Sequence, residues 1–284
     1  MSCETQNVDV TFNDTTAQSL AFDDATALSL AFDDVVNQNI QCSKFEAAGA
    51  TTNAPEFAGV TSWDWSAKSL SALADSDPVD SWTDRHSGLA VAGSGSARPT
   101  KTTVDGVDAV LGDGVDDQLV AAWSPDLLSG YSVFVVYKNL ASVLFEGWIM
   151  ADLGGASASD SIISLYYANA GMKIVSVTNR ASGIQFYESP NVYNAVAKEM
   201  VSAIHGTDVN VRGLYNGRNR NDVNATGGAA IPLFNPTRLL LMAGYDERAF
   251  DGYVHEIVLY EAPLTEVQRD EVWDFLESEW GGPF

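Results

Sequence analysis

The chain has 284 residues, enough for one large β domain with an appendage or for two modest domains. Its 38 acidic residues outnumber 15 basic ones and give a formal net charge of −23. Because phosphate neutralisation needs a Lys/Arg surface, this charge excludes ordinary nucleic-acid binding and disfavours anionic membranes. We interpret the acidity as an adaptation for solubility in salt, with divalent-cation binding as the alternative.

The N-terminal residues predict a protein made without export. Met1-Ser2-Cys3-Glu4 offers neither a basic segment nor an apolar segment of the kind that a secretory signal contains. Cys3 and Cys42 are the only cysteines, and we expect two free thiols of a cytoplasmic protein, with a disulfide between them as the alternative.

Residues 11–40 consist of three copies of a ten-residue repeat, TFNDTTAQSL, AFDDATALSL and AFDDVVNQNI. The Asn/Asp pairs indicate turns, and the Thr-, Ala- and Val-rich residues between them indicate short strands. Three such strands bury too little to fold alone, so we expect residues 1–43 to form a β arm ordered against a partner chain or a second copy. Packing on its own domain and disorder are the alternatives. The side chains expected to anchor the arm are Phe12, Phe22, Phe32, Leu20, Leu30 and Ile40.

A small-residue linker over 44–59 and a β-rich domain over 60–284 are expected to follow. Runs of β-branched and aromatic residues, separated by Gly, Asn, Asp and Ser, predict an all-β sandwich. The predicted strands are 131–137, 162–167, 173–178, 183–188, 199–205, 210–215, 238–242 and 253–260.

One helix is predicted near the C-terminus, over residues 266–280. Thr265 and Gln268 have the spacing of a capping box, and Gly281-Gly282 provides a stop. An apolar stripe of Val272, Phe275, Leu276 and Trp280 is expected to pack on the sandwich.

Two groups of landmarks carry a family resemblance. The first comprises Trp82-Thr83-Asp84-Arg85-His86-Ser87-Gly88, Arg98-Pro99-Thr100 and Asp113-Gly114-Val115-Asp116-Asp117-Gln118-Leu119. The second comprises residues 250–260, FDGYVHEIVLY, and the helix ending in Glu279-Trp280-Gly281. Together they resemble laminin-G-like, concanavalin-A-like jelly rolls of bacteria and phages, over about residues 60 to 282. The resemblance implies an all-β fold: a concanavalin-A-like jelly-roll sandwich with one C-terminal helix, preceded by the repetitive arm.

Most of these landmarks have a structural explanation. Gly114 and Gly252 fit tight turns that need a positive φ, and the carboxylates of Asp113, Asp116 and Asp117 are expected to cap such a turn. Trp82 and Trp280 are expected to be core or edge-sealing aromatics. Glu256 is either a buried, hydrogen-bonded carboxylate or an outward-facing one.

No pattern in the sequence indicates an enzyme. Glycoside hydrolases of this fold place alternating carboxylates along one strand, and neither Glu-x-Asp-x-Glu nor Glu-x-Asp-x-x-Glu occurs. The histidines His86, His205 and His255 lack metal-ligand spacing. No cofactor is expected except calcium, for which Asp246, Glu247 and Asp251 are the candidate ligands.

Glycan binding needs exposed aromatic side chains beside polar ones in the loops. The candidates are Tyr215, Asn216, Arg218, Tyr245 and Arg248, with Trp123, Tyr187 and Asn219 of the same types. Plain turn chemistry is the alternative for 215–222, where Asn216-Gly217 is a hairpin signal.

The resemblance, the arm and the missing export signal favour a non-enzymatic virion structural protein of a tailed phage. It would be a capsid decoration, head-fibre or tail-associated subunit, assembled in the host cytoplasm and anchored to capsid or tail proteins by its arm. A homo-oligomer is expected, with a trimer preferred over a pentamer. The alternative is a lectin-like, receptor-binding module for surface glycans.

Overall fold

The structure, a computed structural model, divides into two units, residues 1–52 and 53–284, and the described residues all lie in the second. They are 53–140, 146–152, 161–168, 173–178, 185–188, 198–206, 212–220, 235–243 and 249–282. The anchoring residues predicted for the arm, and both cysteines, lie outside them, so these predictions are carried forward as predictions.

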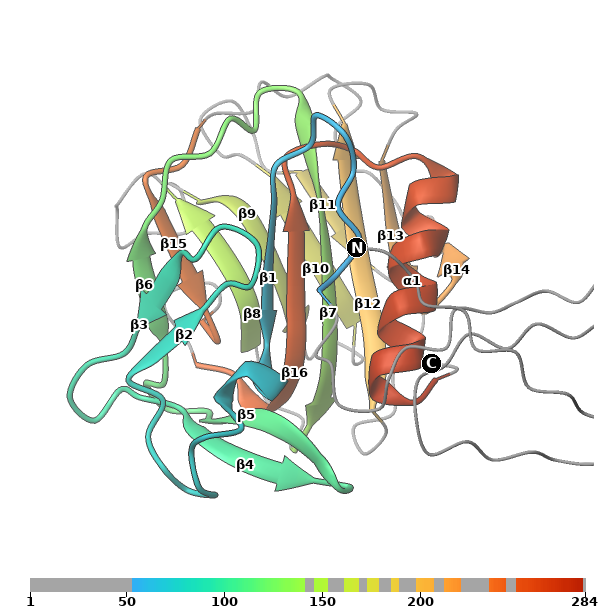
Figure 1. Ribbon diagram of the computed structural model, residues 1–284. Helices are drawn as coiled ribbons and strands as arrows, with labels where there is room; N and C mark the ends of the chain where they lie inside the picture. Colours follow the sequence, from blue (N-terminus) through green and yellow to red (C-terminus); the bar gives the residue numbers. More distant parts are fainter. Residues whose placement is uncertain are drawn as a thin grey trace, which may run out of the picture. The chain divides into compact units, whose positions relative to one another are not determined.

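Two antiparallel sheets form the described domain (Figure 1). The first has the order β14-β13-β12-β7-β16-β5-β4, and β1 also pairs with β16. Its strands are β1 (Ser62–Ser66), β4 (Thr100–Val104), β5 (Val107–Asp113), β7 (Gly130–Asn139), β12 (Glu199–Gly206), β13 (Arg212–Asn216), β14 (Asn219–Arg220) and β16 (Asp251–Tyr260).

The second sheet has the order β11-β10-β9-β8-β15-β6-β3-β2. Its strands are β2 (Ser81–Thr83), β3 (Ala90–Ala92), β6 (Leu119–Ala122), β8 (Glu146–Asp152), β9 (Ser161–Ala168), β10 (Lys173–Thr178), β11 (Gln185–Glu188) and β15 (Arg238–Leu241). In Figure 1 most of this sheet lies behind the first. The all-β sandwich predicted from the sequence is therefore confirmed.

The central strands of the first sheet are buried on both faces. Every residue of β7 from Val133 to Tyr137 is at most 1 % exposed. On the side of the second sheet, Trp63 packs edge-on against Trp123, with ring centroids 5.0 Å apart. On the other side, Phe134 lies edge-on to Tyr260. This double burial explains why β7 is a continuous apolar run instead of an alternating one.

Strand β16 changes partner at a β-bulge. Residues 251–254 pair with β5, whereas residues 256–260 pair with β1 along the same edge. The register against β7 shifts between Val254 and Glu256, so His255 is the extra residue. A bulge re-aims the side chains that follow it, and here Glu256 is completely buried.

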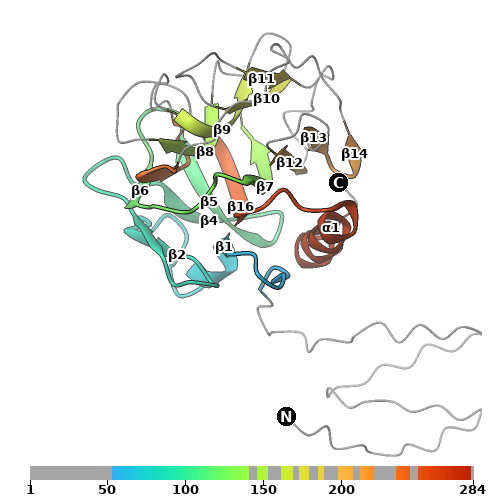
Figure 2. The same ribbon diagram turned by 90° about the horizontal axis from the view of Figure 1, so that it is seen from above.

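Helix α1 (Glu266–Trp280) lies beside β12 and β13, on the face of the first sheet turned away from the second (Figures 1 and 2). The predicted capping box is present, because Thr265 accepts from the Gln268 N–H and the Gln268 side chain accepts from the Thr265 N–H. Gly281 ends the helix in the left-handed conformation. The described residues contain no helix with the length and apolar character that crossing a bilayer requires.

The buried face of α1 differs from the prediction at two residues. Val272, Leu276 and Trp280 are buried as expected, but Trp273 is buried too, and Phe275 is only partly buried. The ring of Trp273 packs edge-on against Tyr215 of β13, at 5.5 Å between centroids. The helix therefore turns a broader apolar face to the sheet than the predicted stripe.

Residues 53–57, which the sequence analysis places in the linker, pack on the domain. Ala54 is 2 % exposed, and its N–H donates to Asp64 at 2.7 Å. The Phe57 ring lies 5.5 Å from that of Tyr260, whose hydroxyl donates to the Pro55 carbonyl. These contacts make the residues before β1 part of the described fold.

The two glycines predicted to need a positive φ behave differently. Gly114 has a φ of 72°, as expected for a turn. Gly252 instead lies inside β16, opposite Gly112, and the prediction of a turn there is wrong. A Cβ at Gly252 would lie 2.6 Å from the Lys138 carbonyl oxygen, so close backbone approach is what requires glycine.

These contacts predict where the chain can be shortened. A chain that begins at Asn53 should unfold cooperatively, with a melting temperature close to that of the full chain. A chain that begins at Val60 loses the contacts of Ala54, Pro55 and Phe57 and leaves buried Asp64 without one donor, so unfolding should cost at least about 2 kcal/mol less. Urea unfolding followed by tryptophan fluorescence measures the difference. Equal stability of the two shortened chains would contradict the packing described here.

Candidate functional site

An acidic turn joins β5 to β6 at one rim of the sandwich. The Asp113 N–H donates to Asp117 Oδ2 at 2.9 Å, and Asp113 Oδ1 accepts from the Val115 N–H at 2.8 Å. A longer bond of 3.4 Å joins the Asp116 N–H to the same oxygen. The predicted capping of this turn is therefore confirmed for the carboxylates of Asp113 and Asp117, whereas the Asp116 carboxylate accepts from the Ser96 hydroxyl instead.

The carboxylates of this turn form a concentrated negative charge. Asp113, Asp116 and Asp117 each offer an oxygen within 4.8 Å of the others. Burial is the main reason that the pKa of Asp117 rises to about 6, and the charges of Asp113 and Asp116 raise it further. Asp251 lies opposite Asp113, and burial together with that neighbour raises its pKa as well. Carboxylate oxygens in this arrangement suit a hard cation such as calcium.

The candidate ligands predicted for calcium are only partly described. Asp251 opens β16 beside the acidic turn, whereas Asp246 and Glu247 lie outside the described residues. The segment 244–248 joins Ala243 to Ala249, which form a bridge with each other. The next residue, Phe250, accepts through its carbonyl from the Gly114 N–H. The described residues that flank this segment therefore lie next to the acidic turn, and we call the carboxylates of Asp113, Asp116, Asp117 and Asp251 the rim site.

The predicted glycan-binding residues fall into two groups. Tyr245 and Arg248 belong to segment 244–248 and are outside the described residues. Tyr215, Asn216 and Arg218 belong to the β13–β14 hairpin beside α1. The structure thus separates residues that the sequence analysis treated as one set.

The hairpin group is occupied by contacts with α1. Tyr215 is 6 % exposed, and its hydroxyl accepts from Arg269 Nη1 at 2.7 Å, so its ring cannot stack on a sugar. Arg218 pairs with Asp274 and, at 2.8 Å, with Glu277. Trp123 is 5 % exposed and packs in the core, which corrects its expected surface position.

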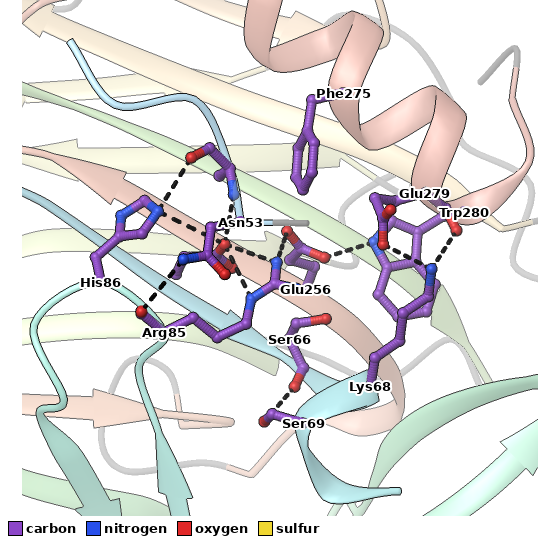
Figure 3. Close-up of polar contacts among 12 residues, drawn as sticks. Asn53, Ser66, Lys68, Ser69, Arg85, His86, Glu256, Phe275, Glu279 and Trp280 are labelled. Carbon is purple, nitrogen blue, oxygen red and sulfur yellow. Dashed lines mark hydrogen bonds and ion pairs between the residues drawn. The ribbon is translucent and has the colours of Figure 1, made fainter. Parts of the chain in front are cut away.

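A second polar cluster lies under α1, and its carboxylates Asp64 and Glu256 are completely buried (Figure 3). Arg85 follows β2, and its Nη2 lies 2.6 Å from Asp64 Oδ2 in β1 and 3.0 Å from Glu256 Oε1 in β16. The Nε of Arg85 also donates to Asp64 Oδ2, at 3.1 Å. Glu256 Oε2 accepts from Trp280 Nε1 at 2.7 Å. The buried alternative for Glu256 is therefore the correct one.

Further contacts tie this cluster to its surroundings. Asp84 accepts from the backbone N–H groups of Asp64, His86 and Ser87. The His86 ring lies between the Ser62 hydroxyl, at 2.8 Å, and the Ala54 carbonyl, at 3.0 Å. Since Asp64 and Glu256 are both 0 % exposed, a substrate has no access to either carboxyl group, and the cluster is structural.

The sequence analysis did not predict this cluster. Arg85 and Glu256 were noted only as landmarks of a family, and Asp64 was not noted. The sequence pattern that could have predicted it is a single carboxylate between large side chains within a strand, as in Trp63-Asp64-Trp65 and His255-Glu256-Ile257. An ionisable group at such a position is buried only if it is paired.

The chain belongs to the class of all-β sandwich proteins, because it has two packed antiparallel sheets and a single C-terminal helix. No family model and no curated relative matches the sequence. Among solved structures, Trypanosoma rangeli sialidase in complex with the inhibitor DANA is similar, with a TM-score of 0.55 at 13% identity. The match covers 82% of this chain and 37% of the sialidase chain.

The same sialidase in complex with sialic acid gives a TM-score of 0.53 at 13% identity, over 83% of this chain and 37% of that chain. Domain 4 of AbnA, a GH43 extracellular arabinanase from Geobacillus stearothermophilus, in complex with arabinotriose, gives 0.49 at 11% identity, over 71% and 98%. The chain spans little more than a third of the sialidase's length, and the likeness to the sialidase shows the fold alone.

The acidic turn yields a prediction about pH. Asp117, with a pKa of about 6, keeps its proton in the folded protein at pH values where the unfolded chain has lost it. Folding stability should therefore fall as pH rises from about 4 to 6 and stay lower above that range. Asp117→Asn, which is neutral throughout and still accepts from the Asp113 N–H, should raise the free energy of unfolding at pH 8 by about 1–2 kcal/mol.

Urea unfolding of both proteins at pH 4 and pH 8, in a chelating buffer, measures this effect. The gain should largely vanish at pH 4. The matched control is Asp116→Asn, which removes the same charge from an exposed position of the same turn and should change stability less. A loss of stability in Asp117→Asn at pH 8 would refute the prediction.

Proposed function

We propose that the chain is a non-enzymatic, lectin-like protein that binds a carbohydrate at the rim site. One observation carries the proposal: the acidic turn lies beside the start of β16, where Ala243 and Ala249 form a bridge. In the sequence, Tyr245 and Arg248 lie between these two alanines. The proposal is that they add an aromatic side chain and a guanidinium to the carboxylates of the rim, since these groups together recognise sugars.

The chemistry of the rim suits a polyhydroxylated ligand. Carboxylates accept hydrogen bonds from sugar hydroxyls, and an aromatic ring packs against the apolar face of a pyranose. Binding at such a site takes place in loops that a rigid scaffold positions. The concanavalin-A-like resemblance and a calcium ion held by Asp113, Asp116, Asp117 or Asp251 belong to this proposal. The sialidase structures named above contain sialic acid or an inhibitor, which makes acidic sugars worth including among the ligands tested.

The absence of catalysis is part of the same proposal. The carboxyl groups of Asp64 and Glu256 are close together, as in a glycoside hydrolase, but they are sealed beneath α1 and bound to Arg85. The sequence has no alternating carboxylate string. Since the likeness to sialidase covers 37% of that enzyme, its activity is not carried over to this chain.

The full chain should bind a subset of neutral or acidic glycans on an array. Tyr245→Ala combined with Arg248→Ala should abolish that binding, because both changes lie in segment 244–248. The matched control is Arg218→Ala, which removes an arginine held by α1, away from the rim site, and should leave binding intact. Assays run with calcium and with a chelator show whether a cation takes part.

Two results would overturn the carbohydrate proposal. One is no binding to any glycan by a folded chain, and the other is unchanged binding by the double variant. Release of free sugar from a bound glycan, lost on substitution of one carboxylate, would overturn the non-enzymatic part alone.

A second candidate function rests on the three repeats of residues 11–40. Each repeat has a phenylalanine at its second position and an aliphatic residue at its tenth, and contains no Lys or Arg that would oppose a partner. This pattern favours a virion structural subunit of a tailed phage that adds strands to a neighbouring chain, either capsid or tail protein or its own copies in a trimer. Such a protein would be found in the virion after assembly in the host cytoplasm.

The second candidate predicts that the arm carries the assembly. Phe12→Ala combined with Phe22→Ala should dissociate the oligomer or release the chain from its particle, since burial of one such side chain contributes about 1.5–3 kcal/mol. Sedimentation reports the stoichiometry, and circular dichroism serves as the control that the sandwich stays folded. An unchanged stoichiometry would mean that the arm is not the anchor.

A further inference from the structure

The buried cluster contains more negative than positive groups in direct contact. Asp64 and Glu256 both bind the single guanidinium of Arg85, and neither carboxyl group has any exposure. Two ionised carboxylates on one guanidinium would leave a net negative charge in a site that water does not reach. An uncompensated buried charge of this kind is so costly that such groups neutralise themselves by keeping a proton.

The hydrogen bonds show where a proton fits. Asp64 Oδ2 accepts from the Ala54 N–H and from Nε and Nη2 of Arg85. Asp64 Oδ1 is buried and accepts no hydrogen bond from a donor among the described residues. The carboxyl groups of Asp64 and Glu256 are neighbours, because Asp64 Oδ2 and Glu256 Oε1 lie 2.6 Å and 3.0 Å from the same nitrogen, Arg85 Nη2. A hydrogen bond between two carboxyl groups requires that one of them is protonated.

The donors favour Glu256 as the group that holds the proton. The three donors on Asp64 stabilise its ionised form, whereas Glu256 accepts one bond from Arg85 and one from Trp280. Burial, reinforced by the charge of Asp64, holds the pKa of Glu256 well above its usual range. Burial raises the pKa of Asp64 too, although Arg85 opposes that rise.

Other titratable groups surround the pair. They come from the segment before β1, from η1 (Ala67–Leu70), from the residues after β2, from β16 and from α1. They are Glu56, Lys68, Asp84, His86, His255, Tyr260, Glu271 and Glu279. Lys68 and Glu279 pair with each other at 2.6 Å, so they add no net charge. His86 lies 3.9 Å from Asp64 Oδ2, and its ring contacts the Ser62 hydroxyl and the Ala54 carbonyl.

We propose that Asp64 and Glu256 share one proton across a carboxyl–carboxyl hydrogen bond, and that this proton forms a pH-sensitive latch joining four parts of the chain. The latch connects the segment before β1 through Ala54, the residues after β2 through Arg85, the strands β1 and β16, and the end of α1 through Trp280. Loss of the proton to solvent at alkaline pH leaves two anions on one guanidinium, and the contacts under α1 weaken.

The direction of the pH effect follows from the number of protons bound. In the unfolded chain both carboxyl groups are ionised above about pH 5. In the folded protein the pair keeps one proton at pH values below the pKa of the pair. Between about pH 5 and that pKa, folding therefore binds one proton. Stability is fully present below the unfolded pKa values and falls as pH rises.

The test compares the folding equilibrium constants of the full chain and of Asp64→Asn at pH 6, 7, 8 and 9, by urea unfolding. An asparagine oxygen can accept from Ala54 and Arg85, while its amide donates to Glu256 in place of the proton. The ratio of the wild-type constant to that of the variant should fall about ten-fold per pH unit, the slope of one proton, until the pKa of the pair is reached. Glu256→Gln should remove the same slope.

Two controls isolate the carboxyl pair. Glu279→Gln removes a carboxylate beside the same Trp280 but outside the pair, and it should keep the wild-type slope. His86→Asn should keep the slope as well. A slope that survives in both Asp64→Asn and Glu256→Gln, or that disappears in His86→Asn, would overturn the proposal.

A measurement on the unchanged protein avoids any loss of folding in the variants. The infrared spectrum of the folded full chain at pH 7 should contain the C=O band of a protonated carboxyl group. That band should disappear at alkaline pH together with a change in tryptophan fluorescence. A spectrum with only ionised carboxylate bands at pH 7 would overturn the shared proton.

Discussion

The guanidinium of Arg85 is the interaction on which the described domain most depends. It binds carboxyl groups from the strands β1 and β16, and these carboxyl groups in turn receive the Ala54 N–H and the Trp280 indole. Each of these partners comes from a different stretch of chain, so the contact brings the first and the last elements of the domain to the same place. Removing one partner would leave a buried charge unpaired, which costs far more than an exposed ion pair contributes.

This arrangement decides which surfaces remain for recognition. The strands β7 and β16 are buried on both faces, because one face meets the second sheet and the other lies under α1 and the residues before β1. A ligand therefore cannot bind on the centre of the first sheet as it would on an open one. The hairpin of β13 and β14 is held by α1 through Arg218 and Arg269. Among the described surfaces, the rim around the acidic turn keeps polar groups that are not all committed to internal contacts.

The sequence predicted those parts of the fold that local patterns determine. The long apolar runs became β7 and β16, and the capping box and Gly281 set both ends of α1. Strands such as β1, β4 and β8 were missed, because Ser-Trp-Asp-Trp-Ser, Thr-Lys-Thr-Thr-Val and Glu-Gly-Trp-Ile-Met-Ala-Asp have no marked apolar run or clean alternation. The buried cluster was missed for another reason. Asp64, Arg85 and Glu256 meet only through the pairing of β1 with β16, and no spacing in the sequence encodes that contact.

Strand β16 links the rim site to the buried cluster. Its first residues pair with β5 and hold the acidic turn beside Asp251, and its residues after the bulge pair with β1 and carry Glu256. The same chemical group therefore meets two dielectric environments within one strand. At the rim, Asp113 and Asp116 are exposed to water and solvent ions, which screen their charges, while burial raises the pKa of their neighbour Asp117 to about 6. Beyond the bulge, Ile257 and Glu256 are both completely buried. Water therefore cannot screen the charge of the Glu256 carboxylate. The bulge permits this change because its extra residue re-aims the side chains that follow it. One strand can therefore carry Asp251 at the acidic rim and Glu256 in the buried pair.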